Sequence, residues 1–373
     1  MAVRAVSASG KLQRQVQAAI DELVASGDEI GLQVAVLHEG RTVVDAVAGV
    51  ADQRTGEPVT PGTLFFAAST GKGVTSSVVH VLAERGTLAY DQRVADVWPE
   101  FGAYGKDVVT LADVLVHAAG VPGLWPEITP ADLGDAGRIC SFIAGQRPWR
   151  VPGTMTGYHA LTFGFIVNEL VRRATGRTLA EQLRIQIAEP LQVAEELHFG
   201  VPGHLLARVA RAGPGGAAPP RPDPGSPPDR AIPPGVQPTA VFANRRDVLS
   251  ADIPSLGTMS ARAAARLYAA LLGHVDGVEL VSPERLQTMA APAFSGTDQV
   301  MGFPTEWALG YSPGRLGSMQ PRPGSTFGMV GSNGTAAYAD IDSGVAIAVM
   351  RNHILGGFST VAAIDDLVTD HYR

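Results

Sequence analysis

The chain has 373 residues, of which 45% are apolar and 6% aromatic, so it can bury a substantial core in one large domain or in two interlocked ones. Charged residues make up 17% of the chain and the net charge is -7, which argues against the basic stripe of a nucleic-acid-binding protein. No apolar run reaches the ~18 residues of a membrane-spanning helix, and the amino terminus lacks the apolar stretch of a signal peptide. We therefore expect a cytoplasmic protein with no nucleic-acid or membrane partner.

A helix and two strands are predicted near the start of the chain. Apolar residues recur at helical spacing from Leu12 to Val24, and Gly27 follows as a stop signal. Residues 32–37 and 42–47 have the pattern of two strands joined by a short turn. A second helix begins close to Ser69 and ends near Gly86.

The remainder predicts a helical insertion and then a return to strands. From about residue 89 to residue 287 the pattern is mainly helical, most clearly at 111–116 and 161–174. Three strands and a closing amphipathic helix follow at 307–311, 335–340, 345–350 and 359–371.

This order of elements predicts an α/β (α+β) fold, with an antiparallel sheet flanked by helices and assembled from both chain ends. We expect residues 1–88 and 288–373 to form the sheet domain and residues 89–287 to form a mainly helical one. The stretch 213–238 is dense in Pro and Gly, which predicts a long surface loop without a regular element. The alternative interpretation of this loop is a flap over a substrate site.

The cysteine and histidine content indicates neither a disulfide nor a metal site. Cys140 is the only cysteine, and its apolar neighbours predict a buried structural thiol. The histidines are scattered, with no His-Glu-x-x-His pattern, so we expect no metal and no cofactor.

A serine and a lysine stand three residues apart at the start of the second predicted helix, in Ser69-Thr70-Gly71-Lys72. Residues i and i+3 share a helix face, so the amine can reach the hydroxyl. The helix start also offers free backbone N–H groups and the positive end of the dipole, which favour a developing oxyanion. A serine needs an adjacent base to act as a nucleophile, and a lysine can be that base when burial lowers its pKa.

Lysine is rare in this chain, which gives Lys72 more weight. The others are Lys11 and Lys106, and arginine supplies nearly all remaining positive charge. Arginine could not replace Lys72 as a base, since a guanidinium does not deprotonate in proteins. The alternative interpretation is a solvated helix lysine near a capping serine, and the pair alone does not decide between the two.

Ser312 is a rival nucleophile, because Gly310-Tyr311-Ser312-Pro313-Gly314 matches the Gly-x-Ser-x-Gly elbow of α/β-hydrolases. That elbow uses the backbone N–H of the residue after the serine, and Pro313 has none. We therefore predict that the match is accidental. A phosphate-binding loop is excluded as well, since Gly73 rather than Ser or Thr follows Lys72.

Further blocks stand before and after the Ser69–Lys72 region in a definite order. They are Gly49-Val50-Ala51-Asp52, Thr63-Leu64-Phe65, Val109-Thr110-Leu111, Leu115-Val116-His117, Gly120-Val121-Pro122, Pro152-Gly153, Tyr158, Gly164, Ala174-Thr175-Gly176 and Glu189-Pro190-Leu191. Over nearly its whole length the chain thus resembles the serine β-lactamase-like superfamily, in particular family VIII carboxylesterases and class C β-lactamases. Penicillin-binding proteins and acyltransferases of the lovastatin type belong to the same superfamily, and the resemblance implies its β-lactamase/transpeptidase-like fold.

The resemblance also implies roles for individual residues. Ser69 would attack the acyl carbon, while Lys72 and Tyr158 would share the proton, their pKa values lowered by mutual proximity and burial. The family's third motif falls on Met329-Val330-Gly331. The backbone N–H of Ser332 would pair with that of Ser69 as the oxyanion hole.

Two departures from the β-lactamase pattern bear on the substrate. The second motif, Tyr-x-Asn in β-lactamases, is Tyr158-His159-Ala160 here and lacks the amide. The third motif, Lys-Thr-Gly in β-lactamases, lacks both the cation and the hydroxyl that receive a substrate carboxylate. Placing a carboxylate against Met329 and Val330 would cost desolvation and a charge-assisted bond. We therefore expect an uncharged ester or thioester as the small-molecule substrate.

Four hypotheses compete. The leading one is a serine carboxylesterase with an apolar acyl pocket and an acyl-enzyme at Ser69. The alternative is an acyltransferase that moves the acyl group to a secondary-metabolite alcohol, and the sequence does not separate the two. β-Lactamase or D-aminopeptidase activity is disfavoured by Met329 and Ala160. An inactive binding protein on the same scaffold is disfavoured by the intact Ser69, Lys72 and Tyr158.

The candidate substrate-binding residues are those that would flank the nucleophile: His159, Trp307, Met329, Val330 and Gly331. For His159 an outward-facing spectator is an equal alternative. For Trp125, Trp149 and Trp307, packing in the core is the simpler interpretation. His117 is interpreted as a structural histidine rather than a catalytic base.

Overall fold

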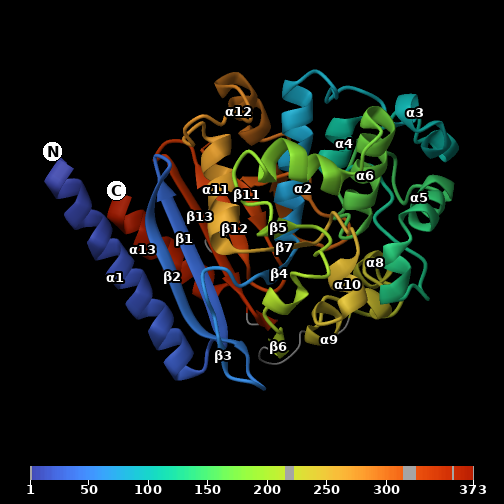
Figure 1. Cartoon of the computed structure of the whole chain (residues 1–373). Coiled ribbons are helices and arrows are strands. Elements are labelled where there is room, and N and C mark those ends of the chain that lie inside the picture. The colour runs from blue at the N-terminus through green and yellow to red at the C-terminus, as the bar shows by residue number, and fades with distance from the viewer. Residues whose placement is uncertain (1, 215–221, 314–324, 355–356, 373) are drawn as a thin grey trace.

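Figure 1 shows the computed structural model of the chain, which describes residues 2–214, 222–313, 325–354 and 357–372. Its α-helices are α1 Ala2–Ser26, α2 Thr70–Glu84, α3 Val94–Val97, α4 Leu111–Leu115, α5 Ala136–Gly145, α6 Thr162–Thr175, α7 Leu179–Leu183, α8 Pro227–Ala231, α9 Ala240–Ala243, α10 Arg246–Ser250, α11 Ala261–Leu271, α12 Pro283–Ala290 and α13 Ser359–Tyr372. Its strands are β1 Gly31–His38, β2 Arg41–Asp52, β3 Glu57–Pro58, β4 Phe65–Ala68, β5 Leu197–His198, β6 Gly213–Pro214, β7 Gly257–Met259, β8 Phe294–Thr297, β9 Pro304–Trp307, β10 Ser312–Pro313, β11 Thr326–Val330, β12 Ala336–Asp340, β13 Val345–Arg351 and β14 His353–Ile354.

The main sheet is antiparallel, and within the described residues it has seven strands in the order β10-β11-β12-β13-β1-β2-β3. β1, from the start of the chain, pairs with β13, from its end, and Val34 lies opposite Val349. The two chain ends therefore meet inside one sheet. This confirms the predicted fold class, an antiparallel sheet flanked by helices and built from both chain ends.

The two faces of the sheet are covered by different helices because side chains alternate along each strand. On one face, Val34 and Val349 belong to a buried cluster that α1 and α13 complete. On the other face, Ala35, Ala346 and Ala348 are small, which lets the alanine-rich helix α11 approach closely. Figure 1 shows α1 and α13 together at the outer side of the sheet, away from α11 and α2.

Helix α2 lies between the main sheet and the inserted helices, and its residues from Thr70 to Ala83 are buried. It contacts β11 and β12 on one side and α6 and α7 on the other. Helix α11, which belongs to the range 89–287, packs on the main sheet instead. The division into a sheet domain and a helical domain stays a proposal, and α11 would be the element that the two share.

One predicted strand is wrong in its bounds. β9 ends at Trp307, and residues 308–311 form a turn in which the Ala308 N–H donates to the Tyr311 carbonyl at 2.9 Å. Gly310 has a φ of 80°, which a strand residue does not adopt, and a side chain there would meet Ser76 of α2. The turn is therefore set by close packing on α2.

The expectation that 213–238 contains no regular element is wrong for the part that the structure describes. β6 pairs in parallel with β14. Helix α8 begins with two prolines, and proline suits a first helical turn because the N–H that it lacks would have no intrahelical partner there. Arg230 of α8 stacks on Trp149, with 4.1 Å between Cζ and the ring centroid. Residues 215–221 lie outside the described residues.

Two further observations concern the described residues as a whole. Cys140 is buried, and burial raises the pKa of its thiol to about 12, which confirms the prediction of a buried structural cysteine. No helix in the described ranges combines the length and the apolar character needed to cross a bilayer.

Candidate active site

Ser69 lies at a sharp junction between β4 and α2. Ala68, directly before it, has a φ of 44°, a left-handed conformation that is strained for any residue with a side chain. Ser69 occupies the residue before the first turn of α2, where its side chain makes no capping hydrogen bond, and it is partly exposed, whereas its neighbours Ala68 and Thr70 are buried. The turn thus presents a single hydroxyl to solvent at the positive end of a 15-residue helix.

The junction is held in place by the turn that joins β11 to β12. The Asn333 side chain donates to the Phe66 carbonyl at 2.8 Å, and the Thr335 hydroxyl donates to the Ala67 carbonyl at 2.8 Å. Gly331 packs so closely that a Cβ there would lie 2.5 Å from the Ala67 carbonyl oxygen. Only glycine fits at this contact, which holds the turn that contains Ser332 against β4, the strand before Ser69.

Lys72 is fully buried behind Ser69. Its Nζ donates to three oxygens: Ser69 Oγ at 3.1 Å, the Ala160 carbonyl at 2.6 Å and the Ser255 carbonyl at 3.2 Å. None of these acceptors is a carboxylate, so nothing in this set compensates a positive charge on the amine.

Burial therefore lowers the pKa of Lys72 from 10.5 to about 7. This agrees with the expected direction for Lys72. Near neutral pH a large fraction of the amine is neutral and has a lone pair that can take the Ser69 proton. The solvated helix lysine, the alternative interpretation of the Ser-x-x-Lys pair, does not match this buried position.

The segment 254–257 is also part of the site, because the Ser255 carbonyl accepts from Lys72 Nζ. The sequence alone did not indicate this contribution. Besides the Lys72 contact, the Ser255 hydroxyl donates to the Leu161 carbonyl at 2.6 Å and accepts from the Gly164 N–H at 2.8 Å. A side chain at Gly164 would meet the Ser255 backbone, and one at Gly71 would meet Gly257. Because these two positions are glycines, the backbones of α2 and α6 can both pack directly on the segment 254–257. Most of the atoms in contact there belong to the backbone.

Tyr158 completes the group around Ser69. Its ring centroid lies 4.9 Å from Lys72 Nζ, and it forms a side-chain hydrogen bond with Ser69. Burial raises the pKa of the Tyr158 hydroxyl, and the Ser69 hydrogen bond offsets only part of that rise. The expectation that proximity and burial lower the pKa of Tyr158 is therefore wrong. A phenol in an apolar setting keeps its proton, so near neutral pH the Tyr158 hydroxyl can donate a proton, whereas the neutral Lys72 amine can accept one.

Aromatic side chains fix the Tyr158 ring. Trp307 lies nearly parallel to it, with 5.9 Å between ring centroids and an interplanar angle of 9°. The His117 ring is 4.8 Å from that of Tyr158 and 4.6 Å from that of Trp307. Trp307 is buried, and its Nε1–H has no hydrogen-bond partner among the residues that the structure describes. Trp307 thus packs against one face of the Tyr158 ring.

The hydrogen-bond partners of His117 and His159 indicate which ring nitrogens accept a hydrogen bond and which carry a hydrogen. His117 Nδ1 accepts from the His159 N–H at 3.2 Å, and His159 Nε2 accepts from the Val121 N–H at 3.0 Å. His159 Nδ1 is 2.6 Å from the Gly157 carbonyl, so this nitrogen carries the hydrogen. Burial lowers the pKa of His159 to about 4 and that of His117 well below its usual range. Both rings are neutral near pH 7, and His159 is buried with both nitrogens bonded rather than directed outward.

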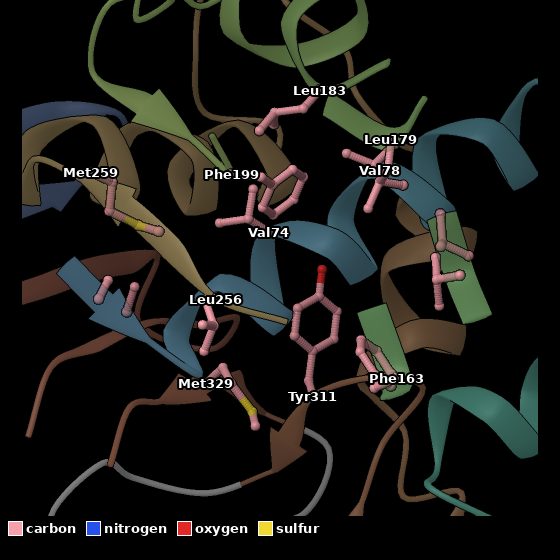
Figure 2. Close-up of a cluster of buried hydrophobic side chains, with 14 of the residues drawn as sticks. Val74, Val78, Phe163, Leu179, Leu183, Phe199, Leu256, Met259, Tyr311 and Met329 are labelled. Carbon is pink, nitrogen blue, oxygen red and sulfur yellow. The ribbon is translucent and has the colours of Figure 1, made fainter. Parts of the chain in front are cut away.

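The third-motif residues point in different directions. Met329 is buried with Val74, Leu256 and Tyr311 in the cluster of Figure 2, on the side of the sheet that faces α2. Val330 packs against the cluster on the opposite face, under α1 and α13. The structure therefore places Met329 behind α2 and does not bring Val330 together with Ser69.

Ser312 does not have the setting of a nucleophile elbow. It lies in the two-residue strand β10 at the edge of the main sheet, where it is paired with Gly328. An elbow serine stands on a turn between a strand and a helix, as Ser69 does. Gly314, the last residue of the match, lies outside the described residues.

Comparisons with known proteins agree with the resemblance. The sequence model of the beta-lactamase family matches residues 16–363. The protein named "Esterase/beta-lactamase LipL" from Mycobacterium tuberculosis is 32% identical over 362 residues, which cover 87% of this chain and 77% of the relative. The crystal structure of a family VIII carboxylesterase has a TM-score of 0.87 at 30% identity, covering 96% of this chain and 97% of that chain. A penicillin-binding protein homolog from Caulobacter crescentus has a TM-score of 0.86 at 32% identity, with equal coverage.

Proposed function

We propose that this chain, which belongs to the beta-lactamase family, is a serine esterase that hydrolyses carboxylic esters through an acyl-enzyme on Ser69. The observation that carries the proposal is the buried Lys72 amine, 3.1 Å from Ser69 Oγ, with its pKa lowered to about 7 and no carboxylate among its hydrogen-bond acceptors. Such an amine can deprotonate a serine hydroxyl near neutral pH.

Acylation follows from this arrangement. Lys72 takes the Ser69 proton as Oγ bonds to the ester carbon, and the carbonyl π electrons move onto its oxygen. The backbone N–H groups of Ser69 and Ser332 stabilise this oxyanion. When the oxyanion collapses, the bond to the alkoxy oxygen breaks, and that oxygen takes the Tyr158 proton. The ammonium of Lys72 then reprotonates Tyr158.

Deacylation repeats these steps with water in place of the serine. Lys72, neutral again, takes a proton from water as the hydroxyl oxygen bonds to the acyl carbon. Ser69 leaves with a proton delivered through Tyr158, and a carboxylic acid is released. An alcohol in the place of water would give acyl transfer by the same route, and this is the alternative function that the test below separates.

The charges near the site favour an uncharged substrate. Met329 puts a thioether where the related β-lactamases have a cation, and it packs in the core rather than at the surface. Arg351 lies behind the β11–β12 turn, but it is buried and pairs with Glu29 at 3.1 Å. Neither residue offers a free cation to a substrate carboxylate, which supports a neutral ester or thioester over a β-lactam.

The test compares the wild-type enzyme with the Ser69→Ala variant on p-nitrophenyl esters of increasing acyl length. We expect release of nitrophenol and a mass increase of one acyl group on the wild-type enzyme, and neither from the variant. Added alcohols separate hydrolysis from transfer, because transfer yields a new ester. Nitrocefin is expected to be hydrolysed slowly or not at all. Undiminished turnover by Ser69→Ala would refute the proposal.

A further inference from the structure

Asp298 is a buried carboxylate next to Tyr158, and the mechanism above does not use it. It lies in the loop that joins β8 to β9 and is only 2% exposed. Its two oxygens accept the Tyr158 backbone N–H at 2.9 and 3.2 Å. Oδ1 also accepts the N–H groups of Val300 and Met301, each at 2.8 Å.

These hydrogen bonds satisfy both oxygens of the Asp298 side chain and fall into two groups, one within the loop and one to Tyr158. The bonds to Val300 and Met301 close the loop on itself, as aspartates commonly do in turns. The bond to Tyr158 crosses 140 residues of sequence and contributes nothing to the turn. Three amide N–H groups converge on this one buried side chain, so the contact to Tyr158 belongs to a set of hydrogen bonds that fixes the orientation of the carboxyl group.

The same hairpin also holds the other end of Tyr158. Trp307, the last residue of β9, stacks on the Tyr158 ring, while Asp298 binds its amide. A further bond, from the Gln299 N–H to the Thr156 carbonyl at 2.9 Å, joins the hairpin to the segment that contains Tyr158. The hairpin therefore holds both the backbone and the ring of the residue that faces Ser69.

We propose that Asp298 is a positioning residue for Tyr158, acting through the tyrosine amide so that the hydroxyl stays within reach of Ser69 and of the leaving group. The inference rests on the proposed function of Tyr158 as proton donor. Asp298 touches no reacting atom, so its effect appears only while the Tyr158 hydroxyl is present.

The test is a double-mutant cycle with Asp298→Asn and Tyr158→Phe, measured on ester hydrolysis and on the rate of Ser69 acylation. The asparagine carbonyl can still cap the loop and keeps the longer contact to the Tyr158 N–H, at 3.2 Å, but an NH2 group replaces the oxygen that accepts this N–H at 2.9 Å and sets a donor against a donor. We expect Asp298→Asn to lower kcat about tenfold or more in the wild-type background, with KM changed less than about threefold. In the Tyr158→Phe background the same substitution should change kcat by less than about twofold.

Asp340→Asn is the matched control. Asp340 also accepts a backbone N–H, from Asp342 at 3.3 Å, and two hydroxyls, from Ser343 at 2.9 Å and from Ser325, but it lies at the end of β12 opposite to the turn that contacts β4. This variant should keep kcat within about twofold of wild type. If Asp298→Asn fails to fold, Asp298→Ser replaces it, since a serine hydroxyl can cap the loop but is too short to reach Tyr158.

The outcomes separate the two proposals. Equal losses from Asp298→Asn in both backgrounds would overturn the positioning role and leave the proposed function intact. Full activity of Tyr158→Phe would overturn the role of Tyr158 itself. A folded Asp298→Asn variant with wild-type kcat would also overturn the positioning role, whereas a loss confined to the tyrosine background supports it.

Discussion

The rate of ester attack should rise with pH through about 7, because in the proposed mechanism the neutral amine of Lys72 takes the Ser69 proton. Burial holds the pKa of this lysine at about 7 instead of 10.5. Since the protonated form predominates below the pKa, kcat/KM should fall as the solution becomes more acidic and level off above about pH 8. This rise in the pH–rate profile would report the titration of Lys72 and not that of either histidine near Tyr158. Burial holds the pKa of His159 at about 4 and that of His117 well below its usual range.

The size of the effect follows from the two pKa values of lysine. At pH 7 roughly half of the Lys72 amines are neutral, against roughly one in three thousand for a lysine with an ordinary pKa, so burial supplies about a thousandfold more base. Between pH 6 and pH 8 the neutral fraction rises about tenfold, from roughly one tenth to roughly nine tenths.

The assay is kcat/KM for p-nitrophenyl butyrate between about pH 5 and about pH 10, read at the isosbestic point of nitrophenol so that product ionisation does not interfere. Lys72→Met should remove the activity. Lys106→Met is the matched control, because Lys106 is also buried and donates to three backbone carbonyls, those of Ala103, Ala144 and Gln146, but lies beside no serine nucleophile. A limb near pH 10, a flat profile from pH 6 to pH 8, or full activity of Lys72→Met would refute the reasoning.

Two further predictions concern the nucleophile and its support. Ser312→Ala should keep kcat/KM within about twofold of wild type, because Ser312 lies in an edge strand; a large loss with an unchanged melting temperature would revive it as a nucleophile. Gly331→Ala should lower kcat about tenfold to a hundredfold, because the new Cβ would lie 2.5 Å from the Ala67 carbonyl and displace the turn that contains Ser332. Gly134→Ala, where a Cβ meets nothing within 4 Å, is its control. If Gly331→Ala were acylated on Ser69 as fast as the wild-type enzyme, the close approach of Gly331 to Ala67 would not be needed to position this turn.

The fold was predictable wherever a segment has one dominant pattern. The period of Leu12, Val16 and Ile20 predicts α1, and these residues are buried against the sheet. The short strand β4 was missed, because four consecutive buried residues do not distinguish a strand from a helix. The turn at 308–311 was missed for another reason: Gly310 is set by its contact with Ser76, which is 234 residues away in the sequence.

The site was predictable to the extent that its residues are close in sequence or belong to a known motif. Ser69 and Lys72 are three residues apart, and helix geometry alone brings their side chains together. The Ala160 and Ser255 carbonyls that complete the Lys72 site are backbone atoms, which every residue has, so no residue type signals them. Asp298 was missed because an isolated aspartate in a loop has no pattern, and its contact to Tyr158 depends on tertiary structure.

Lys72 also lowers the stability of the folded chain, and the sign follows from its two pKa values. The unfolded chain keeps the lysine proton up to a pH of about 10.5, whereas the native state releases it near 7. Between these values the unfolded state binds more protons, so the free energy of unfolding rises with pH across this window and is lowest below about pH 7. The difference corresponds to at most about 5 kcal/mol, which is as large as the whole stability of many domains.

Burial alone does not explain why the fold retains such a group. Lys106 is buried on three carbonyls in the same way, so the chain tolerates an enclosed lysine that has no serine hydroxyl among these acceptors. What distinguishes Lys72 is that one of its three acceptors is a half-exposed hydroxyl at a helix start, while the other two are carbonyls that cannot take a proton from it. Ser69 is therefore the one hydroxyl among these three acceptors, and in the proposed mechanism the lowered pKa of Lys72 acts on the atom that attacks the ester.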